Sequence, residues 1–397
     1  MNLNPLGTVA RGLRTPVVCP GDDLVSIVTE AVRSAASAEG FILRGRDVVG
    51  VTECVLATAQ NNYATVDQIA ADVRAKFPGG DVALVYPYLS RNRMSAIVKG
   101  VARGAKRLTV LLAYPFDELG KALMDPAALG RGGLEGWDQV FEESEFTARF
   151  GQPVNPRSGI NYLTYFKSLI ENEGCEARFL LGNDCAAVLR HTPHALCCCA
   201  HKNDLVTRRL RAQGAQTVLC LSDLLTAPVQ GSGYNPQYGL LGCNLAGLER
   251  VKLFPRDCGA FALAVQQSVQ KAVGTAPHVL VYGDGSYKDP DSGVWECFDP
   301  VICPGSTPGL AGTSQELKLK YLAADRFSSL CGEELQAALM QYLRKAQDSR
   351  ELDAARISTP NHRLVNLLGS LCDLVSGSGD KGTPVVLIQG YFDRYCD

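Results

Sequence analysis

A short acidic segment, residues 278–296, carries the residue types best suited to hold a hard metal ion beside a phosphate. Its apolar start, HVLVY, is long enough for a buried strand and ends in Gly283, Asp284 and Gly285, with Asp289 further along the loop. Glycine lets the backbone approach a ligand, and carboxylate oxygens suit magnesium, manganese or calcium. A surface turn of Asp, Gly and Pro that binds nothing is the competing interpretation.

A glycine-rich loop near the C-terminal end is the second chemical candidate. Gly377, Gly379 and Gly382 alternate with Asp380 and Lys381 between a predicted helix and a predicted strand. Such a loop can aim backbone N–H groups and one cation at phosphates. It is not a P-loop, because no helix follows the lysine. A plain connector is the alternative.

Two arginines and one glutamate could also contribute. Arg91 and Arg93, in the SRNR sequence after the strand around Tyr86, could grip a carboxylate or phosphate with forked hydrogen bonds. A solvated loop is the alternative. Glu53 follows an apolar strand and is a candidate metal ligand or base, or simply an exposed strand end.

A histidine- and cysteine-rich segment, HTPHALCCCAH, has ligand types that suit zinc or a redox centre. It contains His191, His194 and His201 around three adjacent cysteines. Neighbouring residues of a strand point to opposite faces, so the three thiols cannot all bind one ion. Residues 195–200 are therefore expected to form a buried strand of small side chains.

Composition excludes several classes of protein. The 39 Lys and Arg against 41 Asp and Glu give a net charge of -2, so there is no overall basic field for nucleic acid or an acidic membrane. No apolar run approaches the ~20 residues of a membrane helix, and no signal peptide is evident. We therefore expect a cytoplasmic protein whose 15 cysteines are reduced thiols.

The elements that must position these residues alternate between helices and strands, so the class is mixed. Residues 24–35 show helical apolar spacing, with aspartates before them and Gly40 after them. Residues 117–159 are expected to be the least regular part of the chain. Strands are expected at 47–53, 82–86, 108–113, 177–182, 217–221, 279–282 and 385–388, and helices at 256–273, 314–324, 333–345 and 363–375.

Four segments in order, VARGLRTPVVCPGDDLVSIVTEAV, RGRDVVGVTECVLATAQ, VLVYGDGSYKDP and DLVSGSGDKGTPVVLIQG, make the chain resemble the coenzyme F-420 gamma-glutamyl ligases. The likeness is good over about residues 7–60 and 278–390 and poor between them. It implies an α+β fold of mixed, largely antiparallel sheets with packed helices, and a homodimer. It also implies GTP as co-substrate, Mg²⁺ or Mn²⁺, L-glutamate and an acidic acceptor. Residues 1–115 and 277–397 would form the ligase-like parts and 116–276 a divergent middle region.

The resemblance also suggests roles for single residues. It makes Asp284 a metal-binding aspartate, with Gly285 where the family commonly has threonine. The nucleotide-contacting positions fall on Thr15, Pro16, Val17, Val18, Gly377, Gly379, Asp380, Lys381 and Gly382.

Two departures from the family pattern stand out. Thr58 occupies a nucleotide-contacting position where the family usually has lysine, so one phosphate-neutralising cation is missing. The second metal-binding aspartate of the family has no clear counterpart. Residues 159–161 are its nearest echo, with asparagine for the acid, and Asp184 or Asp289 could substitute.

The sequence thus predicts a ligase that uses GTP and a divalent metal to attach glutamate to an acidic small molecule. Asp284 would hold the metal with support from Glu53 and Asp289, Lys381 would hold phosphate, and Arg91 or Arg93 an anionic substrate. A homologue with another acceptor or no turnover is the alternative, and a zinc or redox protein is a third possibility.

Overall fold

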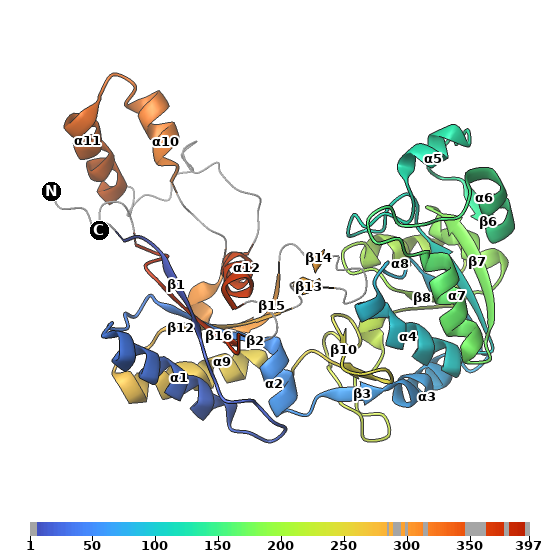
Figure 1. The fold of residues 1–397 in the computed structure, drawn as a ribbon, viewed down its shortest axis with the longest axis horizontal. Helices are drawn as coiled ribbons and strands as arrows, with labels where there is room; N and C mark the ends of the chain where they lie inside the picture. Colours follow the sequence, from blue (N-terminus) through green and yellow to red (C-terminus); the bar gives the residue numbers. More distant parts are fainter. Residues whose placement is uncertain are drawn as a thin grey trace.

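The chain folds into two lobes joined by a narrow waist (Figure 1). The computed structural model describes residues 6–283, 286–288, 295–297, 301–312, 317–345, 363–376 and 381–393. One lobe is built on a five-stranded sheet and the other on a six-stranded sheet, and a three-stranded sheet lies at the waist. The mixed α+β class is confirmed. The expected division at residues 115 and 276 stays a prediction.

The five-stranded sheet joins the two ends of the chain. Its strand order is β1-β16-β2-β12-β15, and only β2 and β12 run parallel. These strands are β1 (Val9–Leu13), β2 (Val48–Thr52), β12 (His278–Gly283), β15 (Ile302–Ser306) and β16 (Val385–Gln389). Four of the five correspond to segments quoted for the family resemblance, so the sheet brings distant motifs together.

Helices cover both faces of this sheet. Successive side chains of a strand point to opposite faces, and apolar side chains on both faces are buried. Val49 and Val51 pack with α1 (Leu24–Glu39) and α9 (Cys258–Val273), while Val48 packs with α12 (Leu364–Ser376). Helix α1 begins as expected at an aspartate cap, Asp23, whose side chain accepts from the Ser26 amide, and it ends at Gly40 in the left-handed region.

The six-stranded sheet is made from one continuous stretch of chain. Its order is β6-β7-β5-β4-β8-β9, and all pairs are parallel except β6 with β7. These strands are β4 (Asp81–Val85), β5 (Arg107–Leu112), β6 (Val140–Glu142), β7 (Glu176–Gly182), β8 (His194–Cys197) and β9 (Thr217–Cys220).

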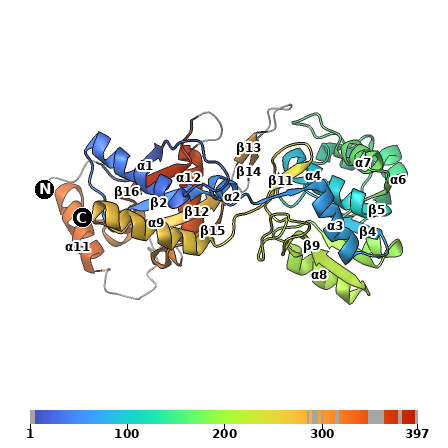
Figure 2. The same cartoon turned by 90° about the horizontal axis from the view of Figure 1, so that it is seen from below.

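Both faces of this sheet are buried, which explains its nearly continuous apolar strands. Val82 and Leu84 face a core shared with α3 (Val66–Lys76), α4 (Arg91–Gly104) and α7 (Tyr162–Asn172). Ala83 and Val85 face η1 (Cys185–Arg190) and α8 (Asn203–Ala212). Figure 2 shows α8 across the sheet from α7.

The stretch expected to be irregular, residues 117–159, contains α5 (Pro126–Arg131), β6 and α6 (Glu143–Phe150). These short elements are held by an aromatic cluster of Phe141, Phe146 and Phe150 with Tyr114. These elements were not predicted because the glycines and acids of the segment give no helical or strand pattern, and the aromatic residues meet only in the tertiary structure.

The waist contains α2 (Glu53–Ala59) and a small antiparallel sheet of β3 (Tyr63–Thr65), β11 (Arg250–Lys252) and β10 (Asn244–Leu245). The remaining elements are β13 (Ser286–Lys288), β14 (Trp295–Cys297), α10 (Leu319–Tyr321), α11 (Gly332–Lys345), and the short turns η2 (Leu221–Asp223), η3 (Pro308–Leu310) and η4 (Leu322–Arg326). Among the described helices, none has the length and apolar character to cross a membrane.

Candidate functional site

One edge of the five-stranded sheet collects the loops that the sequence singled out. Strand β16 is antiparallel to both neighbours, so its first residue, Val385, lies opposite Leu13 at the end of β1 and Val51 near the end of β2. The Thr15 amide donates to the Gly382 carbonyl at 3.3 Å, and the Thr52 amide donates to the Pro384 carbonyl at 2.9 Å. The predicted nucleotide segments are therefore neighbours in the fold.

A buried acid and a buried base meet at this edge. Glu53, the first residue of α2, is 3% exposed, and its Oε1 accepts a hydrogen bond from Nζ of Lys252 on β11. Burial acts to lower the pKa of Lys252, but the negative charge of Glu53 and its hydrogen bond outweigh this effect and raise the pKa. Lys252 therefore stays charged inside the protein.

The second oxygen of Glu53 is open to a ligand. Glu53 Oε2 is buried and has no hydrogen-bond partner among the described residues. A buried carboxylate oxygen left unpaired is costly, so such atoms commonly mark a site for an ion, a water or a substrate. This feature favours Glu53 as a ligand or base over the exposed strand end.

Gly283 allows this carboxylate to approach the end of β12. A Cβ built at residue 283 would overlap the Glu53 side chain, so only glycine fits there. Tyr282 lies opposite Thr52 in the parallel pairing, which places the ends of β2 and β12 side by side. Asp284 follows Gly283 directly in the sequence. Asp284, Gly285, Asp289, Gly377, Gly379 and Asp380 themselves lie outside the described residues.

The other predicted nucleotide positions are mostly open to solvent. Val17 is 89% exposed, whereas Val18 packs against the core beside α1. Pro16 and Lys381 are exposed, and the Thr15 hydroxyl donates to the Pro16 carbonyl at 2.9 Å. An exposed side chain such as that of Val17 contributes nothing to the core and is free to contact a ligand.

Within the described residues, the hydrogen bonds of the Thr58 side chain are to neutral groups. Its hydroxyl donates to the Cys54 carbonyl at 2.9 Å and lies 3.0 Å from the Tyr63 hydroxyl. Tyr63 is the cross-strand partner of Lys252. Helix α2 has no lysine at position 58, but Lys252 supplies a cation on the neighbouring strand β11. The sequence analysis did not identify Lys252. The signal was a lysine between Val251 and Leu253, in an apolar run where a charge needs a partner.

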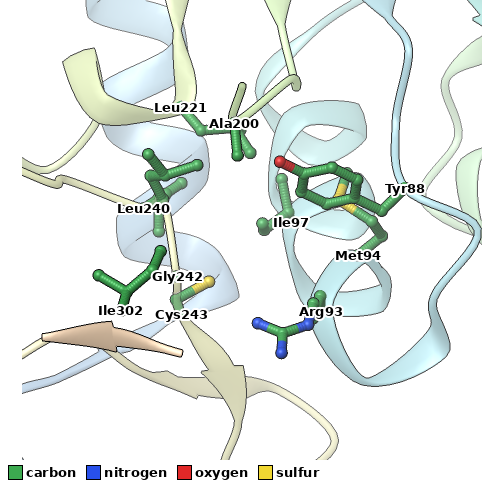
Figure 3. A pocket seen from close by; sticks show the side chains of 11 residues that line it. Tyr88, Arg93, Met94, Ile97, Ala200, Leu221, Leu240, Gly242, Cys243 and Ile302 are labelled. Atoms are coloured by element: carbon green, nitrogen blue, oxygen red, sulfur yellow. The ribbon is translucent and has the colours of Figure 1, made fainter. Parts of the chain in front are cut away.

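The SRNR sequence begins a helix, which contradicts the alternative of a solvated loop. Ser90 caps α4 by accepting from the Arg93 amide at 3.1 Å. Arg91 is half-buried, whereas Arg93 is 5% exposed and lines a cavity of about 20 Å³ at the junction of the lobes. Figure 3 shows its guanidinium turned toward the side of the cavity that Cys243 and Ile302 line.

Arg93 and Lys252 both lie close enough to the buried thiol of Cys243 for their positive charges to affect its pKa. Burial raises the pKa of Cys243 to about 12, against the opposing positive charges of Arg93 and Lys252. Two buried cations therefore lie near one buried thiol at the waist. The cavity beside Arg93 has room only for a single water molecule.

The histidine and cysteine segment is structural in the described fold. Cys197 and Cys199 face one side of the six-stranded sheet and Cys198 the other, as the alternation predicted. No cluster of three or more His, Cys, Asp or Glu suited to a metal occurs among the described residues. Asp184 caps η1 and pairs with Arg209 at 3.2 Å, and Asn161 caps α7. Asp184, one of the two proposed substitutes for the second metal-binding acid, and Asn161, in the nearest echo of the family motif, thus have local structural roles.

The fold and the charged sheet edge describe an α+β enzyme scaffold with a buried acid–base pair at its waist. Residues 12–390 match the family model of the F420-0:gamma-glutamyl ligases, and the chain belongs to this family. The membership identifies a ligase and supports a gamma-glutamyl ligase activity. A comparison with curated proteins found no match.

Proposed function

We propose that the protein is a GTP- and divalent-metal-dependent ligase that joins L-glutamate to an acidic small molecule, coenzyme F-420-0 or a related compound. The observation that carries this proposal is the Glu53 carboxylate, which pairs with Lys252 through one oxygen and offers the other beside Gly283. Asp284 is the next residue in the chain, so acids follow the ends of two adjacent parallel strands.

This donor set fits a hard divalent cation. Carboxylate oxygens are the ligands that Mg²⁺ and Mn²⁺ prefer, and Glu53 Oε2 is buried yet uncommitted within the described part of the chain. We expect Glu53 and Asp284 to hold the ion, with Asp289 as a further candidate. When bound, the ion would neutralise negative charge on the phosphates.

The remaining residues of the edge suit a nucleotide and an acid. Lys252 supplies the positive charge that α2 lacks at Thr58, and Lys381 adds an exposed cation next to Gly382. The backbone of residues 15–18 lies against this loop through the Thr15 to Gly382 hydrogen bond. Arg93, and Arg91 beside it on α4, would attract the acidic acceptor to the waist.

The chemistry follows from the need to activate a carboxylate. A carboxylate oxygen of the acceptor attacks the γ-phosphorus of GTP, which releases GDP and leaves an acyl phosphate. The glutamate amine then attacks the acyl carbon, loses a proton and expels phosphate, so the amide forms. The cations stabilise the charge on the transferred phosphoryl group. We also expect the protein to work as a homodimer.

Binding is tested by thermal shift with GTP, ATP and Mn²⁺, since a ligand that binds only the folded state raises its apparent stability. We expect GTP with Mn²⁺ to raise Tm in the wild type, and Asp284→Asn and Glu53→Gln to lose the Mn²⁺-dependent part. Asp204→Asn, an exposed acid on α8, is the matched control. Equal Mn²⁺ shifts in all four proteins would remove the metal assignment.

Turnover is tested by phosphate release with L-glutamate and coenzyme F-420-0. We expect release that requires GTP, metal, glutamate and acceptor together. Binding of GTP and Mn²⁺ without release for any amino acid or acceptor would instead support the second candidate, a homologue without turnover, to which the threonine at position 58 points.

A further inference from the structure

The six-stranded lobe contains a cavity that takes no part in the proposed ligase site. Its volume is about 290 Å³, which is close to the lower end of the ~300–1,000 Å³ typical of ligand pockets. This is room for about ten water molecules at ~30 Å³ each, and hence for a molecule of amino-acid size.

The cavity lies where open parallel sheets commonly bind ligands. The chain lays β5 and β7 to one side of β4 and then adds β8 and β9 on the other side, so the winding reverses between β4 and β8. Four lining residues directly follow strand ends or lie just beyond them: Tyr86 after β4, Ala113 after β5, Asn183 after β7 and Cys199 after β8. The carboxyl ends of the strands at such a reversal form a crevice suited to a ligand.

Tyr86 has two features that the fold alone does not explain. Its φ is 54°, a left-handed conformation that is strained for an aromatic residue and that is typical of functional sites. Its hydroxyl is shielded from solvent and has no hydrogen-bond partner within the part of the chain that the structure describes. Burial raises the pKa of this phenol, so it remains a neutral donor.

The charges around the cavity favour an anion. Glu118, the lining acid, is already satisfied by the backbone amides of Ala200, His201 and Lys202. The lining cations are Lys202, which directly precedes α8, and Arg209 near its C-terminal end. Arg209 also pairs with Asp184. Glu118 and Asp184 therefore have partners within the fold, and Lys202 is the lining cation that forms no ion pair among the described residues, so it is available to an anion.

The apolar part of the wall lies at the rim. Phe116 and Leu205 line the cavity and remain 44% and 63% exposed, which is unusual for large apolar side chains unless a surface is used. An apolar rim, a positive wall and a buried hydroxyl at one site are complementary to a molecule with a charged head and a compact apolar body.

We infer that this cavity is a second binding site, which takes a small organic anion with a carboxylate or phosphate-ester head on a compact apolar body. Lys202 and Arg209 bind the head, Phe116 and Leu205 pack against the body, and the Tyr86 hydroxyl donates to a polar atom of the ligand.

Thermal-shift titrations with benzoate, phenyl phosphate and inorganic phosphate test this inference. We expect benzoate or phenyl phosphate to give a saturable rise in Tm, and the stronger of the two identifies the head group. Inorganic phosphate, which lacks the apolar body, should give a much smaller rise. A shift from inorganic phosphate as large as that from phenyl phosphate would overturn the apolar part of the inference. No shift from either aromatic anion would overturn all of it.

Variants locate the site without reference to ligase activity. Lys202→Ala with Arg209→Ala should weaken binding by about tenfold or more, whereas Arg208→Ala, on the same helix but outside the cavity, should not. Tyr86→Phe removes a hydroxyl that supports no described contact, so the fold should be unaffected while binding weakens by about threefold to tenfold. Unchanged binding in both cavity variants would refute the assignment.

A crystal soaked with 4-bromobenzoate gives a direct readout, because bromine is located by its anomalous scattering. Bromine between Phe116 and Leu205 would confirm the site, and bromine elsewhere would refute it. All of these measurements report binding alone, so they can fail while the proposed ligase activity stands, and the reverse also holds.

Discussion

The two lobes are assembled in opposite ways. The five-stranded sheet takes β1 and β2 from the start of the chain and β12, β15 and β16 from its last third, whereas all strands of the six-stranded sheet come from residues 81–220. The candidate ligase edge exists only when distant segments pair. The cavity of the other lobe arises from successive strand ends of one stretch. Long-range pairing thus creates the first site, and local winding creates the second.

The most severe test of this difference is to remove β16. A chain that ends after Ser376 lacks the strand that pairs with both β1 and β2, and we expect the five-stranded lobe not to fold. Losing a fully buried central strand should exceed the ~5–15 kcal/mol that stabilise a typical domain. The six-stranded lobe should keep a cooperative transition in scanning calorimetry.

The matched control ends after Gly390 and retains β16. It should show the transitions of the complete chain. If the shorter protein, ending after Ser376, still shows the same transitions as this control, the two lobes do not differ in the way that their strand pairing indicates.

The next largest effect is expected for the buried ion pair. Lys252→Met leaves the Glu53 charge buried without its partner, which should lower the free energy of unfolding by about 3–5 kcal/mol. Lys99→Met breaks the more exposed pair between Lys99 of α4 and Glu249, whose side chain is 50% exposed. This change should lower the free energy of unfolding by about 0–1 kcal/mol. Urea unfolding measures both values.

A double variant serves as the internal control for this pair. Glu53→Leu with Lys252→Met replaces both charges by apolar groups and should recover most of the loss, because the unpaired charge is then gone. A Lys252→Met protein as stable as Lys99→Met would mean that the buried pair is no stronger than a surface pair.

A smaller effect is expected at the close approach of β12 and α2. Gly283→Ala adds a Cβ where the Glu53 side chain lies, and overpacking should lower the free energy of unfolding by about 1–3 kcal/mol. Gly259→Ala in α9 has open space, so it should stabilise the helix by about 0.5–1 kcal/mol. In thermal unfolding, Gly283→Ala should have a lower Tm than the wild type and Gly259→Ala a higher one.

The smallest effect is a pH dependence of the six-stranded lobe. Hydrogen bonds from Lys99 and then Arg103 hold the pKa of Glu249 below its ordinary value. Its stabilising contribution is therefore complete above the ordinary glutamate pKa of ~4.3 and is lost as the pH falls through the lowered value. Because Glu249 is half exposed, we expect less than about 1 kcal/mol. Wild type and Glu249→Gln, unfolded from about pH 6 to about pH 3, should converge at the acid end.

Local pattern predicted α1 and most strands of the two large sheets, but none of the helices from α2 to α7. The aspartates before Leu24 and the glycine at position 40 marked both ends of α1, and the apolar runs marked β2, β4, β5, β7, β9, β12 and β16 within a few residues. The helix that starts at SRNR was not predicted, and a solvated loop was left open as an alternative, whereas Ser90 acts as a helix cap. A cap is recognised only when the helix that follows is recognised.

The candidate site was predicted less completely, for a physical reason. Glu53 and the loop ending at Gly382 were found by residue type, but nothing local indicates that their strands pair through β16. Lys252 was missed because its partner lies 199 residues away. A buried charge can be suspected from an apolar context, yet its counterion is set by tertiary structure.

The Glu53–Lys252 contact also limits how the lobes can move. Glu53 begins α2 on the side of the five-stranded sheet, and Lys252 belongs to the small sheet at the waist. A motion that separates α2 from β11 would break the ion pair between Glu53 and Lys252. If both charges stayed buried, the loss of their pairing would cost about 3–5 kcal/mol. Such open forms would account for roughly one molecule in a hundred or fewer. The pair thus holds α2 against β11, so a metal ion that binds Glu53 Oε2 would meet two elements already fixed in place.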